Sequence, residues 1–213
     1  MTSPALSVVR ALALAAARHS GQKAKGKPER AFVEHLIEVA ALVVEATEGA
    51  DAVLATAALL HDSLEKTDTS LPELEQRFGP AVASVVAEVS DDEELSEDER
   101  KREQVSRAPS LSPRAKMIRL ADKTSNLWAL ATEGDDAWPL EKRRAYLAWA
   151  AAVAEGCRGV SAMLDQAFDE AAAAFAGGLV ETVPPIAGVA TSSDGAGEAS
   201  SQMSGALTPR QRP

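Results

Sequence analysis

The sequence predicts an all-α protein whose helices pack as one bundle. Only 4% of its 213 residues are aromatic, and alanine is abundant. This composition favours closely packed helices over strands, because strands are richer in aromatic and β-branched residues. Apolar residues also recur at the i, i+3, i+4, i+7 spacing of a helix that buries one face, as in Phe32, Leu36 and Val39 around His35. Together these observations indicate a helical bundle.

Five helices are expected in the first half of the chain. Their predicted positions are residues 5–19, 31–48 and 51–64, a short helix that ends at Gly79, and a helix that begins at Pro80. Glycine closes the first two, at Gly21 and Gly49. Ser70 and Glu73 form the capping-box pattern that starts the short helix.

Three further helices are expected in the second half, over residues 113–130, 139–155 and 159–177. Ser112 followed by Pro113 is a strong signal for the start of the first of them. Residues 91–103 carry eight acids and three bases, and we interpret them as an acidic loop that includes a second capping-box pattern.

The composition changes near residue 180, where large apolar side chains become scarce and Pro, Gly, Ser, Thr and Ala dominate. Such a segment buries too little surface to offset the entropy cost of ordering. We therefore expect a folded domain over residues 1–178 and a disordered tail over 179–213. The alternative is an ordered arm that packs over the domain.

The net charge of -10 argues against general affinity for nucleic acid or for anionic membranes. No apolar stretch approaches the roughly 20 residues of a membrane span, and the N-terminus lacks a signal-peptide pattern. A single cysteine, Cys157, excludes an internal disulfide and fits a reducing compartment. The expected location is the cytoplasm, and the sequence predicts no particular oligomeric state.

Four side chains from three predicted helices form a candidate metal site. They are His35, His61, Asp62 and Asp122. A histidine on an apolar helix face is more often a core residue than a ligand, but an acid on such a face is costly unless it is paired or binds a metal. Two neutral imidazoles and two carboxylates would offset a divalent ion, and this mixture suits Mn²⁺, Fe²⁺ or Zn²⁺ better than Ca²⁺.

Glu65 follows His61 by four residues and Asp62 by three, so it would project beside the ligands if the helix continues. There it could accept a proton from an attacking water. The alternative is a solvated residue that pairs with Lys66 or Lys123.

Two more groups suggest a phosphate-rich ligand. Arg119 and Asn126 share a helix face with Asp122, and a cation and an amide there could hold phosphate or ribose oxygens. Residues 18–30 contain five basic residues and one acid, including Lys23 and Lys25. The alternatives are a solvated polar stripe and an ordinary lysine-rich surface loop.

Taken together, these residues resemble the HD-type phosphohydrolases and, among them, the small alarmone hydrolases, single-domain relatives of the hydrolase half of the Rel/SpoT enzymes. The resembling passages are residues 32–35, 57–65, 77–79, 120–123, 126–127, Tyr146 and 149–151. The resemblance implies an HD-domain helical bundle, Mn²⁺ as the cofactor, and removal of the 3′-pyrophosphate from guanosine tetra- or pentaphosphate. It also implies that the candidate site holds the metal and that Lys25, Asn126 and Tyr146 lie in the nucleotide pocket.

The expected enzyme is therefore a metal-dependent nucleotide 3′-pyrophosphohydrolase. Its expected catalytic residues are Glu65, Lys66 and Asn126, and its expected substrate-binding residues are Lys23, Lys25, Arg119, Asn126 and Tyr146. The sequence departs from the family's pattern at Lys66, where an aspartate is usual, and at Ala24, where an arginine commonly stacks on guanine. The first departure leaves open a catalytically weakened sensor of nucleotide and metal. The second leaves open another substrate, such as an adenosine alarmone or NADPH. A weaker third alternative is a helical interaction module.

Overall fold

The computed structural model describes residues 3–25, 29–132 and 138–178. The helices of its first half are α1 (Pro4–Arg18), α2 (Phe32–Ala46), α3 (Ala52–Leu60), α4 (Ser63–Lys66), α5 (Leu71–Phe78) and α6 (Pro80–Val89). Those of its second half are α7 (Glu97–Arg107), the 3₁₀ helix η1 (Ala108–Ser110), α8 (Pro113–Thr132), α9 (Leu140–Cys157) and α10 (Ala162–Gly177). Within the described ranges, β pairing is limited to one isolated antiparallel bridge between Lys23 and Ala31. The all-α prediction is confirmed, whereas the predicted tail at 179–213 lies outside the described residues.

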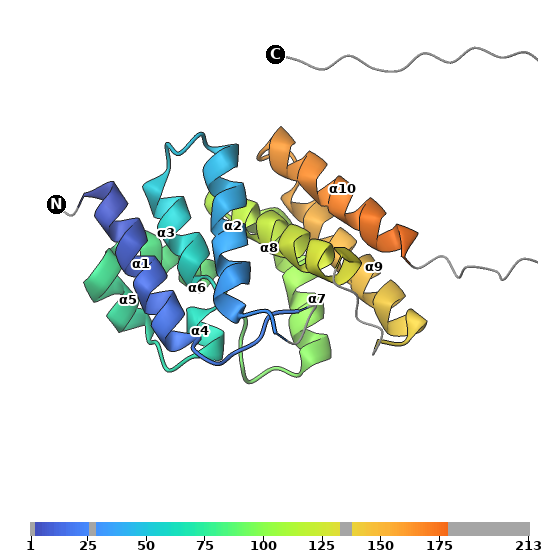
Figure 1. Ribbon diagram of the computed structural model, residues 1–213, viewed down its shortest axis with the longest axis horizontal. Helices are drawn as coiled ribbons and strands as arrows, with labels where there is room; N and C mark the ends of the chain where they lie inside the picture. The colour runs from blue at the N-terminus through green and yellow to red at the C-terminus, as the bar shows by residue number, and fades with distance from the viewer. Residues whose placement is uncertain (1–2, 26–28, 133–137, 179–213) are drawn as a thin grey trace, which may run out of the picture. The chain divides into compact units, whose positions relative to one another are not determined.

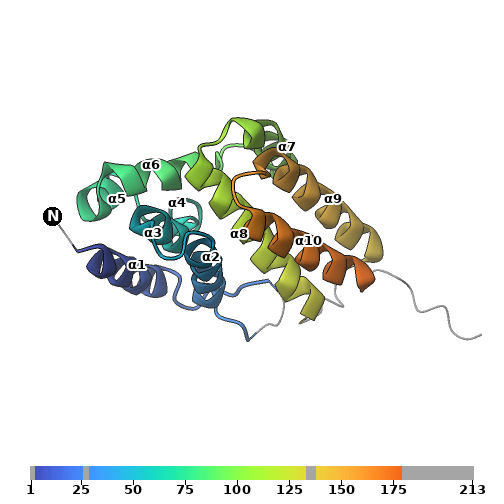
Figure 2. The same ribbon diagram turned by 90° about the horizontal axis from the view of Figure 1, so that it is seen from above.

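Helix α8 lies at the centre of the bundle (Figures 1 and 2). It packs against α2 and α6 on one side and against α9 and α10 on the other. Helix α3 lies against α1, α2 and α6, and α5 packs on α6. This position buries every residue of α8 from Met117 to Leu127, so the polar side chains of that stretch are held inside the protein. The site described below is built on them.

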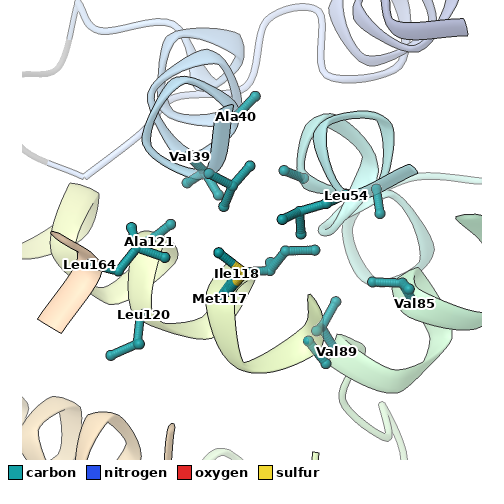
Figure 3. Packing of buried hydrophobic residues seen from close by; sticks show 14 of the residues in the cluster. Val39, Ala40, Leu54, Val85, Val89, Met117, Ile118, Leu120, Ala121 and Leu164 are labelled. Atoms are coloured by element: carbon teal, nitrogen blue, oxygen red, sulfur yellow. The ribbon is translucent and has the colours of Figure 1, made fainter. Parts of the chain in front are cut away.

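The core is made of small and branched aliphatic side chains that interlock between helices. Figure 3 shows Val39 of α2, Leu54 of α3 and Val85 of α6 gathered around Ile118 of α8, with Leu164 of α10 near Ala121. Val39, Leu54 and Ile118 are fully buried. Alanines at many other core positions let the helix backbones approach closely, as the composition predicted, while Phe168 and Phe175 of α10 are among the largest buried side chains. Among the described residues, no helix combines the length and the apolar character needed to cross a membrane.

One predicted helix is interrupted at the candidate metal site. The sequence predicts a single helix over 51–64, but α3 ends at Leu60 and α4 begins at Ser63. His61 keeps helical angles, and Asp62, with φ of -99° and ψ of 1°, turns the chain. The expectation of a continuous helix was therefore wrong at the two residues that carry the site.

The prediction of an acidic loop was also wrong from residue 97 onward, where α7 forms. Its capping box is complete, because the Ser96 hydroxyl accepts from the Glu99 N–H and the Glu99 carboxylate accepts from the Ser96 N–H. At the start of α5 only half of the predicted box forms. Ser70 accepts from the Glu73 N–H, while the Glu73 carboxylate pairs with Arg18.

Candidate metal centre and substrate pocket

The four predicted metal ligands lie together inside the bundle. His35 comes from α2, His61 and Asp62 from the α3–α4 junction, and Asp122 from α8, and none is more than 8% exposed. Single donor atoms of His35, His61 and Asp62 lie within 4.8 Å of one another, a spacing that could hold a metal ion. Asp122 Oδ1 lies 3.4 Å from His35 Nε2 and 3.9 Å from His61 Nε2. Three separate parts of the chain thus bring two imidazoles and two carboxylates to one point.

The imidazole of His61 is oriented as a metal ligand requires. Its Nδ1 lies 2.8 Å from the carbonyl oxygen of Ala58, which can only accept, so Nδ1 carries the proton and Nε2 carries the lone pair. Nε2 is buried and has no hydrogen-bond partner among the residues that the structure describes. It lies 3.4 Å from Asp62 Oδ2. A buried lone pair between two carboxylates fits a cation, and the donor set therefore fits a divalent metal.

The charge states of these groups favour metal binding. Burial lowers the pKa of His61, which keeps its imidazole neutral near pH 7. Burial alone would raise the pKa of Asp122, but the adjacent Lys123 ammonium outweighs it and holds that pKa well below its usual range. Burial opposes ionisation of Asp62 in the same way, and the hydrogen-bonded ammonium of Lys66 helps to lower its pKa. Both carboxylates are thus anionic.

Each aspartate is also held by neighbouring side chains. Lys123 Nζ donates to Asp122 Oδ2 at 2.7 Å, and Asn126 Nδ2 donates to Asp122 Oδ1 at 2.6 Å. Lys66 Nζ donates to Asp62 Oδ2 at 2.7 Å and lies 4.6 Å from the centre of the Phe32 ring. Both lysines therefore pair with the aspartates, and the alternative in which one of them pairs with Glu65 is not what the structure shows.

Glu65 lies at the site in spite of the helix break. Its carboxylate accepts a hydrogen bond from the backbone N–H of Asp91 at 2.9 Å. Burial, together with the charges of Asp62 and Asp91, raises the pKa of Glu65 to about 7. A carboxyl group with that pKa can exchange a proton near neutral pH, which suits a general base.

A pocket of about 550 Å³ opens over the candidate metal site. Its lining includes most of the predicted site residues, namely Lys23, Lys25, His35, Asp62, Glu65, Lys66, Arg119, Asp122 and Asn126. Tyr146 lies outside it and lines an adjoining pocket of about 420 Å³ that shares Lys25 and Trp149 with the first. The Lys25 ammonium lies 5.7 Å from the centre of the Tyr146 ring. The two pockets together offer room for an elongated ligand that reaches the metal site at one end.

The profile of the HD domain matches residues 11–151, about two thirds of the chain. The chain belongs to the HD domain family. Two proteins similar to it are described as guanosine-3′,5′-bis(diphosphate) 3′-pyrophosphohydrolase MESH1. The one from Drosophila melanogaster is 41% identical over 170 residues, which cover 79% of this chain and 94% of that protein. The one from Homo sapiens is 40% identical over 167 residues, which cover 78% of this chain and 93% of that protein.

A solved structure of similar sequence and fold supports the same family relationship. It is described as "A metazoan ortholog of SpoT hydrolyzes ppGpp and plays a role in starvation responses", and it aligns with a TM-score of 0.75 and 38% sequence identity. The alignment covers 80% of this chain and 96% of that one. The predicted family and the predicted HD-domain fold are confirmed.

Sequence reasoning offered no grounds for assigning a role to Asp91 or Gln104, which also line the pocket of this HD domain. Arg119, expected to contact phosphate, donates to Asp91 Oδ1 at 2.9 Å, and Gln104 Nε2 donates to the other oxygen of Asp91 at 2.5 Å. Lys123 Nζ lies 4.4 Å from the centre of the Trp149 ring. Asp91 belongs to the acidic run, where nothing in the sequence distinguishes it from its neighbours. Lys123 could have been found, because a lysine in an apolar stretch beside an aspartate needs a partner.

Proposed function

We propose that this HD-domain protein is a metal-dependent hydrolase that removes the 3′-pyrophosphate from guanosine tetra- and pentaphosphate. The observation that carries the proposal is the buried, unpartnered Nε2 of His61. It faces the carboxylates of Asp62 and Asp122, which line a pocket together with several lysines and Arg119, although His61 itself is not part of that lining. The roughly 40% identity to proteins described as MESH1 over most of the chain supports the choice of substrate. The cytoplasm remains the proposed location.

His35, His61, Asp62 and Asp122 are the residues proposed to hold the ion. Their two nitrogens and two oxygens suit Mn²⁺, Fe²⁺ or Zn²⁺, and Mn²⁺ is the proposed ion because the resemblance to the alarmone hydrolases implies it. When bound, a divalent ion polarises a phosphoryl oxygen and lowers the pKa of a nearby water.

The remaining residues have roles that follow from their places in the two pockets. Glu65 accepts the proton of the attacking water, for which its raised pKa suits it. Lys23, Lys25 and Arg119 offset the phosphate charge. The Tyr146 hydroxyl is buried and has no hydrogen-bond partner among the described residues, so it is available to a ligand.

Asn126 has a double role in this proposal. Its side-chain amide donates to both the carboxylate and the carbonyl of Asp122, which fixes that ligand. It also lines the pocket and can contact the ribose or a phosphate.

The test is pyrophosphate release from guanosine tetraphosphate by the purified protein in Mn²⁺, together with the metal content. We expect turnover by the wild type and loss of both metal and turnover in His61→Ala. The matched control is Glu45→Gln, a change of an exposed acid on α2, which should alter neither. A wild type that binds Mn²⁺ and does not release pyrophosphate from this nucleotide would overturn the proposal.

The second candidate is a sensor that binds metal and nucleotide with little turnover. It is favoured by one observation, the ion pair between Lys66 and Asp62, which places an ammonium on a proposed metal ligand. The variant Lys66→Asp distinguishes the sensor from the hydrolase. A sensor gains turnover on this change, whereas an active hydrolase already releases pyrophosphate without it. The adenosine analogue is run in the same assay, because faster turnover of that substrate would replace the guanine assignment.

A further inference from the structure

A hydrogen-bonded chain runs from the candidate metal site to the surface between α2 and α8. His35 Nδ1 lies 2.9 Å from Ser125 Oγ, and Ser125 Oγ donates to Glu38 Oε2 at 2.6 Å. The other carboxylate oxygen of Glu38 pairs with the guanidinium of Arg30. His35, Ser125 and Arg30 are buried, whereas the side chain of Glu38 is 48% exposed. We call these four residues the His35 relay.

The direction of the hydrogen bonds fixes the tautomer of His35. A serine hydroxyl has one proton, and Ser125 gives it to a carboxylate that can only accept. Ser125 must then accept from His35, so Nδ1 carries the proton and Nε2 carries the lone pair. Nε2 is also the atom that lies 3.4 Å from Asp122 Oδ1 at the candidate metal site.

The two histidines of the site are therefore oriented by different means. His61 Nδ1 donates to a backbone carbonyl, that of Ala58, which no side-chain substitution can remove. His35 depends on side chains from two helices. Glu38 and Ser125 also line a groove of about 320 Å³ between α2 and α8, whose lining includes none of the proposed metal ligands.

We propose that Glu38 and Ser125 are positioning residues that hold the Nε2 lone pair of His35 toward the metal, and so set the metal affinity from outside the substrate pocket. The inference rests on the proposed metal centre. Outer partners of metal-binding histidines typically contribute about 10- to 100-fold to metal affinity. Without Glu38, the Ser125 hydroxyl is free to turn and donate to Nδ1, which moves the imidazole proton to Nε2 and blocks the lone pair.

The experiment compares Glu38→Ala with Glu45→Ala. Both acids lie on α2 and line the same groove, but Glu45 is not part of the relay. We expect Glu38→Ala to weaken Mn²⁺ binding by about tenfold or more, as measured by titration calorimetry, and Glu45→Ala to leave it unchanged. Ser125→Ala should weaken binding in the same way, because it leaves the Nδ1–H without an acceptor.

A second readout tests the relay in metal-free protein. At about pH 8, nitrogen-15 NMR reports the tautomer of His35. The relay predicts the Nδ1–H form in the wild type and in Glu45→Ala, and a shift toward Nε2–H in Glu38→Ala. A merely structural role for Glu38 would not move this signal.

Equal Mn²⁺ affinity and an unchanged His35 tautomer in Glu38→Ala would overturn the inference. A wild type that neither binds Mn²⁺ nor releases pyrophosphate would overturn the proposed function instead. The tautomer comparison, which needs no metal, would then still decide whether the relay orients His35.

Discussion

Lys66 Nζ lies 2.7 Å from Asp62 Oδ2, the same carboxylate oxygen that lies 3.4 Å from His61 Nε2. The ammonium thus occupies the side of the carboxylate that faces the other proposed ligands. At Asp122 the arrangement differs, because Lys123 pairs with Oδ2 while Oδ1 faces His35 and His61. In the proposed metal centre, Lys66, unlike Lys123, would therefore compete with the ion for a ligand atom.

Removal of this competition should tighten metal binding. We expect Lys66→Met to lower the Kd for Mn²⁺ about fivefold, or about 1 kcal/mol, since its side chain is 40% exposed and its pairing is screened by solvent. Titration calorimetry measures the change. The control is Lys101→Met, because Lys101 has a similar exposure of 37% and a similar i,i+4 pair, with Glu97, outside the proposed ligand set. Unchanged or weaker binding in Lys66→Met would show that Lys66 does not compete.

Glu65 should make the stability of the metal-free protein depend on pH. Its pKa is raised to about 7 in the folded state, from an ordinary value of 4.5. Between these values the unfolded chain releases the proton first, so the free energy of unfolding falls as the pH rises and levels off above about pH 7. The full loss is on the order of 3 kcal/mol.

The variant Glu65→Gln avoids this loss, because an amide stays neutral and its oxygen can still accept from the Asp91 N–H. In EDTA, its unfolding temperature should match that of the wild type near pH 4 and exceed it at pH 8. Thermal unfolding followed by circular dichroism gives both values, with Glu45→Gln as the control. A constant difference across this pH range would contradict the raised pKa.

Gly156 permits a close contact between α9 and η1. A Cβ at this position would lie 2.6 Å from the Cβ of Ala108 and 2.9 Å from Cδ of Pro109. We expect Gly156→Ala to lower the free energy of unfolding by about 1–3 kcal/mol, even though alanine favours a helix by about 1 kcal/mol. The control is Gly177→Ala, where an added Cβ meets nothing within 4 Å. Urea denaturation of the two variants should give effects of opposite sign.

Cys157 should be inert while the protein is folded. Its side chain is fully buried, and burial raises the pKa of the thiol to about 11, so little thiolate forms near pH 8. A thiol reagent such as DTNB should label it slowly in buffer and rapidly in denaturant. Rapid labelling of the folded protein would contradict the packing of α9 in the core.

The fold and the clustering of the proposed metal ligands could be predicted because their signals are local patterns. Helical spacing and capping signals gave the helices. Asp62 and Asp122 could be identified as candidate ligands because they lie on apolar helix faces, where burying an acid without a partner is too costly. The break at His61 was not predictable, since His61 and Asp62 both tolerate a helix and no glycine or proline lies between Ala52 and Lys66. The acidic segment was misread as a loop although its capping-box pattern at Ser96 was recognised, because the run of charged residues was given more weight than that signal.

The partners of the site residues could not be predicted, because they depend on distances between helices. Arg119 pairs with Asp91, which is 28 positions away in the sequence. His35 is linked through Ser125, 90 positions away, to Glu38. Tyr146 lies in the adjoining pocket, a placement that follows from how α9 crosses α8 and that no local pattern contains.

The interruption between α3 and α4 limits where the protein can tolerate insertions and deletions. In an unbroken helix, neighbouring residues point about 100° apart, so His61 and Asp62 could not face one point. The turn at Asp62 brings their donor atoms to 3.4 Å. An insertion or deletion of one residue within α3 would turn His61 and Asp62 together by about 100°, away from His35 and Asp122. The segment from Ser90 to Leu95, which joins α6 to α7, is free of that constraint except at Asp91. Among relatives, variation in length should therefore gather in such connections and spare the α3–α4 junction.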